Sequence, residues 1–202
     1  MTFTDVNLDD QELREAKKQL RLAGKKTRAR VVLESGAEVA QRLAEHGLSF
    51  CQPAPGSVVS GFAPFGEELD ATPLMLRLMD EGCTLALPVM VGKAKPLIFR
   101  AWKPGDDMKE AMWGIMEPRD DAPVAIPDVV LVPLLAFDTR GYRVGYGGGF
   151  YDRTLAELKA KKSVVTVGLA LDEMKVDAVP HDNYDQRVDW VLTPSGPIRC
   201  GD

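Results

Sequence analysis

The chain has 202 residues, of which 45% are hydrophobic and 27% charged, so we expect one soluble globular domain over residues 1–202 with a well-buried core. A formal net charge of -5 argues against a general nucleic-acid binder and against a membrane-surface protein, since both need a basic surplus. Cys51, Cys83 and Cys200 are odd in number and widely spaced, which predicts neither a disulfide framework nor a zinc site and favours a reducing cytoplasm. No run of residues is typical of a signal peptide or a membrane span.

Helical patterns occupy the N-terminal part of the chain. Asp9 followed by Glu12 predicts a capping box, which starts a basic amphipathic helix that ends near Leu22. Gly24 interrupts the pattern, and a second helix is expected from about residue 27 to residue 45. On their own, the basic residues of this region are typical of a solvated helix face.

Apolar β runs alternate with helices through the rest of the chain. Thr72-Pro73 predicts a helix with Thr72 as its N-cap and proline in the first helical position, and another helix is expected over residues 151–161. Strands are expected over residues 57–62, 84–90, 96–102, 129–135, 164–170 and 190–193, whereas residues 108–127 are expected to form a loop. Strands that are apolar throughout imply a mostly parallel sheet covered on both faces, a three-layer α/β/α, Rossmann-like fold. In such sheets ligands bind at the carboxyl ends of the strands.

The most informative stretch is DVVLVPLLAFDTRGYRVGYGGGFYDR, residues 128–153. An apolar strand is followed by Gly145 and Gly147–Gly149 and then by a helix, which is the arrangement of a phosphate cradle, because glycine lets the backbone approach an anion. Asp152 would repel phosphate unless a cation lay between them, so the stretch predicts a divalent cation. A plain glycine-rich turn, with an acid that suits the helix dipole, stays open on the glycines alone.

Five ordered blocks carry a family resemblance. Residues 133–153 (PLLAFDTRGYRVGYGGGFYDR) resemble the most characteristic block of the 5-formyltetrahydrofolate cyclo-ligases, also called methenyltetrahydrofolate synthetases. The other blocks agree in order and spacing: KKQLR at 17–21, ELD at 68–70, WGIMEP at 113–118, and HD at 181–182 with VDWVLT at 188–193. The resemblance covers residues 15–194 and implies the architecture shared with sugar-phosphate isomerases and CoA-transferases.

This resemblance implies a ligase that uses ATP and Mg2+ to convert 5-formyltetrahydrofolate to 5,10-methenyltetrahydrofolate, with release of ADP and phosphate. The formyl oxygen is a poor leaving group, so its phosphorylation would allow ring closure, a reaction that needs positioning and charge neutralisation. The implied partners are these small molecules, without nucleic acid or membrane, in a monomer or weak homodimer.

The resemblance also assigns site residues. Arg143 and Tyr151 would be catalytic, and Asp152 and Asp189 would hold Mg2+. Glu68, Trp113, Tyr146 and Phe150 would bind the folate. ATP would contact Lys17, Lys18, Gln19, Leu20, Arg21, Arg143, Val144, Gly145, Tyr146, Gly147, Gly148, Gly149, Phe150 and Tyr151.

One departure from the family pattern concerns the glycine loop. Some relatives carry basic side chains at the positions of Tyr146 and Gly148, so here the backbone, Arg143 and the metal would have to neutralise the phosphates. Two other readings stay open: a sugar-phosphate isomerase or CoA-transferase-like enzyme, which would not use ATP, and a folate- or nucleotide-binding regulatory protein without turnover.

Overall fold

The computed structural model describes residues 9–201. Its centre is a seven-stranded sheet in the order β11-β10-β9-β6-β1-β2-β3. The neighbours from β10 to β2 are parallel, whereas β3 and β11 are antiparallel and form the two edges. The strands are β1 Val58–Ser60, β2 Thr84–Met90, β3 Leu97–Ala101, β6 Val129–Pro133, β9 Val165–Leu169, β10 Trp190–Thr193 and β11 Gly196–Arg199. The predicted mostly parallel sheet is therefore confirmed, and β11 is an addition.

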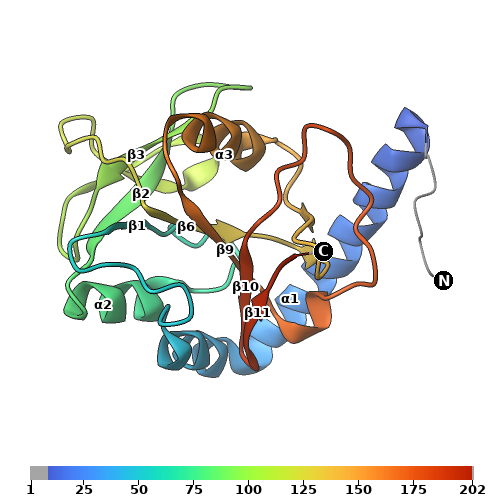
Figure 1. Cartoon of the computed structure of the whole chain (residues 1–202), viewed down its shortest axis with the longest axis horizontal. Helices are drawn as coiled ribbons and strands as arrows, with labels where there is room; N and C mark the ends of the chain where they lie inside the picture. The colour runs from blue at the N-terminus through green and yellow to red at the C-terminus, as the bar shows by residue number, and fades with distance from the viewer. Residues whose placement is uncertain (1–8, 202) are drawn as a thin grey trace.

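Helices cover both faces of this sheet, as Figure 1 shows: α3 (Phe150–Lys161) lies on one face, and α2 (Thr72–Asp80) with the C-terminal part of α1 lies on the other. This is the predicted three-layer α/β/α fold. The central strand β6 explains why both faces must be covered, because Val129 to Val132 are all 0–2% exposed and alternate between the two faces.

The long helix α1 (Asp10–His46) differs from the two helices that we expected. The predicted capping box is present: the Asp9 carboxylate accepts the backbone N–H of Glu12, and the Glu12 carboxylate accepts the backbone N–H of Asp9. The helix runs through Gly24 and kinks at Ser35 instead, where φ is -152° and ψ is 23°. The prediction of a break at Gly24 was wrong because this glycine serves close packing: a Cβ there would lie 2.1 Å from the carbonyl oxygen of Leu135.

The start of α2 also differs slightly from the prediction. Its N-cap is Ala71, so Thr72 is already helical and Pro73 follows it in the first turn. The backbone N–H of Thr72 donates instead to Asp70 Oδ1 at 2.9 Å. Proline is still tolerated there, since the first-turn N–H groups of a helix have no intrahelical partner.

Two small hairpins extend from the carboxyl edge of the sheet. β7 (Ala136–Phe137) pairs with β8 (Arg143–Val144) and leads from β6 into the glycine loop. β4 (Met108–Glu110) pairs with β5 (Met116–Pro118), with a 3-10 turn at Met112–Gly114 between them. The prediction that residues 108–127 form a loop was therefore wrong over residues 108–118. A second 3-10 turn, Asp172–Met174, follows β9.

The β7–β8 hairpin owes its shape to Asp138, which is fully buried. Its carboxylate accepts the backbone N–H groups of Arg140, Tyr142 and Val179 and pairs with the Arg140 guanidinium at 2.8 Å. A buried carboxylate with this many donors is well compensated. It fixes the segment that delivers the glycine loop to the sheet edge. Within residues 9–201, no helix combines the length and the apolar character that a bilayer crossing requires.

Candidate active site

A cavity of about 600 Å3 opens at the carboxyl edge of the sheet, where ligands of such folds bind. The N-terminal half of α1, the glycine loop, the start of α3, the loop before α2 and the β4–β5 hairpin all contribute to its wall. One part of the wall carries charge and backbone amides, and the other is apolar and aromatic. The apolar and aromatic lining includes Phe62, Phe65, Pro88, Met90, Leu97, Trp113, Ile115, Met116 and Phe150.

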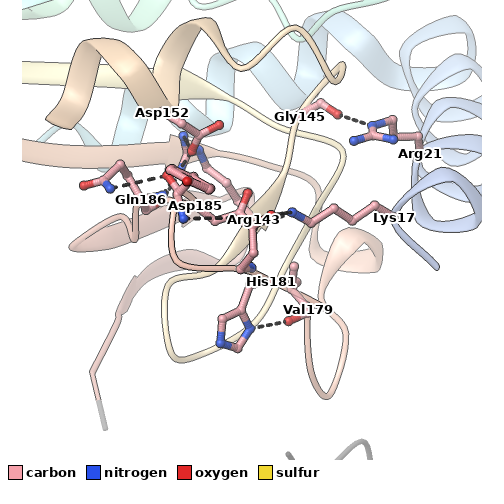
Figure 2. Close-up of polar contacts among 11 residues, drawn as sticks. Lys17, Arg21, Arg143, Gly145, Asp152, Val179, His181, Asp185 and Gln186 are labelled. Carbon is pink, nitrogen blue, oxygen red and sulfur yellow. Dashed lines mark hydrogen bonds and ion pairs between the residues drawn. The ribbon is translucent and has the colours of Figure 1, made fainter. Parts of the chain in front are cut away.

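The glycine loop lies against arginines from two helices. Arg21 of α1 donates from Nε to the carbonyl oxygen of Gly145 at 3.0 Å, and Arg153 of α3 donates to the carbonyl oxygen of Gly148 at 2.7 Å (Figure 2 shows the first of these). Gly147 and Gly149 have φ values of 98° and 64°, and Gly149 is the N-cap of α3. Glycine adopts this left-handed backbone without strain. The first N–H groups of α3 thus lie at the cavity wall.

Of the five residues predicted at 17–21, two line the cavity. Lys17 and Arg21 are four residues apart and share one face of α1, as predicted. Lys18 and Gln19 are exposed, line no part of the cavity and hydrogen-bond Glu15. Leu20 packs with the small apolar cluster that contains Ala136, Val144 and Val179. The structure therefore separates the block into a cavity face and a face that points elsewhere.

Acidic residues already pair with the cations of the cavity. Lys17 Nζ forms an ion pair with Asp185 and lies 3.6 Å from Asp182. Arg143, which is 7% exposed, donates to Asp152 Oδ1 at 2.9 Å and to the carbonyl oxygen of Gln186. Asp152 Oδ1 also accepts the backbone N–H of Gln186 at 3.0 Å. Figure 2 shows how these pairs hold residues 185–186 beside the site.

Asp189 does not line the cavity, so the structure does not bring together the predicted metal pair of Asp152 and Asp189. Asp189 precedes the amino end of β10, whereas the glycine loop follows the carboxyl end of β6. Its Oδ2 accepts both the backbone N–H and the hydroxyl of Thr166 at 2.7 Å. Asp189 therefore joins β9 to β10. The acid that the structure does bring to the site is Asp185, which the sequence reasoning missed although it stands four residues earlier.

Within residues 9–201 no group of three or more His, Cys, Asp or Glu side chains could hold a metal ion by itself. Asp152 and Asp185 both line the cavity. Mg2+ needs only one or two carboxylates when phosphates and water supply its other ligands. These two residues therefore fit a Mg2+ ion that arrives together with a nucleotide.

Glu68 comes from the loop before α2 and lines the same cavity. Its Oε2 accepts the backbone N–H of Phe65 at 2.9 Å. Burial raises the pKa of this carboxyl, while the Phe65 amide, Arg28 and Tyr146 each act in the opposite direction. Close by, Trp113 meets Phe150 edge-on, with ring centroids 6.4 Å apart. Trp113 lies in the 3-10 turn between β4 and β5, is 59% exposed and has a φ of 64°.

Both tyrosines of the glycine loop region are held in the neutral form. Burial, followed by the charge of Glu68, raises the pKa of Tyr146 to about 12. Tyr151 lines the cavity, and its pKa is raised further by burial and by Glu68. A phenol with a raised pKa donates a hydrogen bond at neutral pH and does not act as a base.

The sequence profile of the 5-formyltetrahydrofolate cyclo-ligase family matches residues 13–194. The chain belongs to this family. It is 30% identical to the 5-formyltetrahydrofolate cyclo-ligase of Haemophilus influenzae over 174 residues, which cover 84% of this chain and 92% of that protein. The Escherichia coli K12 protein of the same name is 35% identical over 167 residues, which cover 80% and 91%.

Solved structures agree with this membership. The Aquifex aeolicus 5,10-methenyltetrahydrofolate synthetase superposes with a TM-score of 0.71 at 26% identity, over 92% of this chain and 93% of that one. The Mycoplasma pneumoniae 5,10-methenyltetrahydrofolate synthetase shares the fold, with a TM-score of 0.67 at 19% identity. The predicted family and enzyme class, a ligase, are thereby confirmed.

Two buried charged residues near the cyclo-ligase site were missed by the sequence reasoning. Arg28 is 4% exposed and stands eleven residues after Lys17, a spacing that puts it on the same face of α1 as Lys17 and Arg21. Glu117 is 2% exposed, lines the cavity and accepts the backbone N–H of Met90 at 2.9 Å. Glu117 thus attaches the β4–β5 hairpin, which carries Trp113, to the end of β2.

Proposed function

We propose that the protein catalyses the ATP-dependent cyclisation of 5-formyltetrahydrofolate to 5,10-methenyltetrahydrofolate, with release of ADP and phosphate. The observation that carries this proposal is the division of one cavity into two halves. A glycine loop and two cations line the same cavity as a carboxylate and several aromatic side chains, so a triphosphate and a flat heterocycle can bind side by side. We also propose that residues 1–202 form one catalytic domain, and its cytoplasmic location stays a prediction.

For the ATP half, the support is the supply of donors. The N–H groups of the glycine loop and of the first turn of α3 favour an anion. Lys17 and Arg21 add two positive charges to the lining of the cavity, Arg21 directly beside the glycine loop. ATP binding would exchange the Lys17–Asp185 pair for a Lys17–phosphate pair and so release the carboxylate of Asp185. The loop residues 145–151 need no basic side chain of their own under this arrangement.

For the folate half, the support is the pairing of a carboxylate with flat apolar walls. Glu68 can accept two hydrogen bonds from the adjacent amino and ring N–H groups of a pterin. Trp113 and Phe150, which meet edge-on, offer ring faces and edges to the aromatic parts of the folate. Met90, Leu97 and the other apolar residues of the wall keep water away from the reacting carbon.

In the proposed reaction the formyl oxygen attacks the γ-phosphorus of ATP, and ADP leaves. The folate N10 then attacks the activated formyl carbon, the C–O bond breaks, and phosphate departs with the former formyl oxygen while N10 loses its proton. Tyr151 lines the cavity, and its hydroxyl is protonated at neutral pH, so it can donate a hydrogen bond to the formyl oxygen. Arg143 holds Asp152 in place and adds positive charge beside the loop.

Mg2+ belongs to the proposal as the ion that accompanies ATP, and it would supply charge neutralisation for the phosphates. Asp152 and Asp185 are the residues that would hold it. The hydrogen bonds and ion pair of Asp152 described above all use Oδ1, which leaves Oδ2 for a ligand.

The test is an assay of the purified protein with 5-formyltetrahydrofolate, ATP and Mg2+. We expect the near-ultraviolet absorbance of the methenyl product and ADP to rise together in equal amounts, and no product without ATP. A Lys17→Met variant should raise the KM for ATP, while Lys26→Met, an exposed change on the same helix, should not. Folate binding without turnover would support the regulatory reading instead and would refute the proposal.

A further inference from the structure

Arg28 is a buried cation that the proposed reaction does not use. It lies on the face of α1 that also carries Lys17, Arg21 and Gly24, but deeper in the protein, where it is 4% exposed. The other face of α1 is exposed along the same stretch. An arginine side chain buried to this degree is expensive unless its charge and donors are matched.

The contacts of Arg28 converge on the folate half of the cavity. Its guanidinium donates to the Tyr146 hydroxyl and lies 5.2 Å from the centroid of the Tyr146 ring. Both Arg28 and Tyr146 act on the Glu68 carboxyl and lower its pKa against the effect of burial. Arg28, Tyr146 and Glu68 come from α1, the glycine loop and the loop before α2, so the cluster joins three separate segments.

One donor of Arg28 is unmatched. Its Nε is buried and has no hydrogen-bond partner among residues 9–201. A buried donor without a partner destabilises a fold by about 1–3 kcal/mol. A contribution to stability alone therefore explains poorly why an arginine is buried here. A role in substrate binding explains it directly.

We propose that Arg28 is a positioning residue for the folate substrate: with Tyr146 it holds the Glu68 carboxylate as the acceptor for a ring edge that presents adjacent N–H donors. Hydrogen bonds in a chain polarise one another, so the Arg28 cation makes the Tyr146 hydroxyl a stronger donor, and the two residues together fix the Glu68 carboxylate in place. Tyr146 then links Arg28 to Glu68, a role that a tyrosine can fill although some relatives carry a basic side chain at this position. This inference rests on the proposed function, since it concerns the same site.

The purely structural alternative predicts a different result. If Arg28 only anchored the glycine loop to α1, its loss would disturb that loop, and therefore ATP binding, at least as much as folate binding. If Arg28 instead positions the Glu68 carboxylate, its loss weakens folate binding and leaves ATP binding nearly unchanged. The two cases separate in the KM values for the two substrates.

The experiment compares Arg28→Met, Arg28→Lys and Tyr146→Phe with the control Lys26→Met in steady-state kinetics. Loss of a hydrogen bond to a charged group raises a dissociation constant by about tenfold or more. We expect Arg28→Met and Tyr146→Phe to raise the KM for 5-formyltetrahydrofolate by about this factor and to change the KM for ATP by less than about twofold. Arg28→Lys should recover part of the loss because it keeps the cation, and the double variant should be no worse than Arg28→Met because both act through one chain.

An unchanged folate KM in Tyr146→Phe, or equal increases in both KM values in Arg28→Met, would overturn the inference. Tyr146→Phe decides the matter if Arg28→Met fails to fold, since it keeps the ring. If the wild-type protein gives no methenyl product, the proposed function fails, and calorimetric binding of 5-formyltetrahydrofolate then decides the inference. Binding that is about tenfold weaker in Arg28→Met supports it, and equal binding or no binding by the wild type refutes it.

Discussion

Gly24→Ala tests whether the close approach of α1 to the sheet sets the position of the ATP-binding cations. The new Cβ would lie 2.1 Å from the carbonyl oxygen of Leu135 and 2.8 Å from its carbonyl carbon. These are backbone atoms, and Leu135 is fully buried with its N–H bonded to the carbonyl oxygen of Val144 at 2.7 Å. The loop is therefore held in place, and the helix must move.

The size of the effect follows from this distance. A separation of at least 3.0 Å requires a shift of 3.0 - 2.1 = 0.9 Å. Overpacking of this kind costs about 1–3 kcal/mol, whereas replacement of glycine by alanine within a helix returns about 1 kcal/mol. The net destabilisation should be about 1 kcal/mol. Since a displacement of about 1 Å at a reacting centre can lower the rate about a hundredfold, kcat/KM for ATP should fall by about tenfold to a hundredfold.

The matched control is Gly36→Ala in the same helix. There the new Cβ would meet the side chain of Val32, whose nearest methyl group lies at 3.3 Å and can adjust. Urea unfolding should find Gly36→Ala as stable as the wild type or more stable by up to about 1 kcal/mol, with normal kinetics. If Gly24→Ala matched Gly36→Ala in stability and kept the wild-type kcat/KM for ATP, the reasoning would be refuted.

Two further predictions concern the acidic residues. Asp152→Asn should lower kcat about a hundredfold, whereas Asp189→Asn should leave kcat within about twofold and lower the free energy of unfolding by about 1 kcal/mol, because the Asp189 carboxylate bonds Thr166 and does not line the cavity. Steady-state kinetics and urea unfolding check both, and a large loss of kcat in Asp189→Asn would restore the metal pair that the structure separates. Because burial raises the pKa of Glu68, its acceptor form is lost at a higher pH than in an ordinary glutamate, so kcat/KM for the folate should fall on acidification with a midpoint above that of an ordinary glutamate. Glu68→Gln should lack this acidic limb and show a folate KM raised about tenfold at neutral pH; an unchanged pH profile would contradict the assignment.

Much of the fold followed from local pattern. The apolar run at residues 129–132 predicted a strand buried on both faces, and the glycine loop predicted the functional edge, because both depend on neighbouring residues alone. The prediction of a helix break at Gly24 was wrong for the opposite reason. Its role depends on Leu135, which lies 111 positions later in the chain, and a helix pattern cannot reveal such an approach.

The site residues also divide into those that local sequence pattern could place and those that depend on tertiary packing. Lys17 and Arg21 could be placed on one face from helical spacing, but the exclusion of Lys18 required the packing of α1 on the sheet. Asp185 and Asp189 stand four residues apart in an irregular segment, so periodicity could not say which of them reaches the cavity. Arg28 was predicted as part of a solvated basic face, and only tertiary packing shows that it is buried.

The transfer of the formyl oxygen to phosphate tests the central claim most directly. 5-Formyltetrahydrofolate labelled with oxygen-18 in its formyl group would be converted with unlabelled ATP and Mg2+, and the released phosphate analysed by mass spectrometry. The proposed reaction predicts one labelled oxygen in each phosphate, in step with formation of the methenyl product and ADP. Unlabelled phosphate, or methenyl product without ADP, would contradict it.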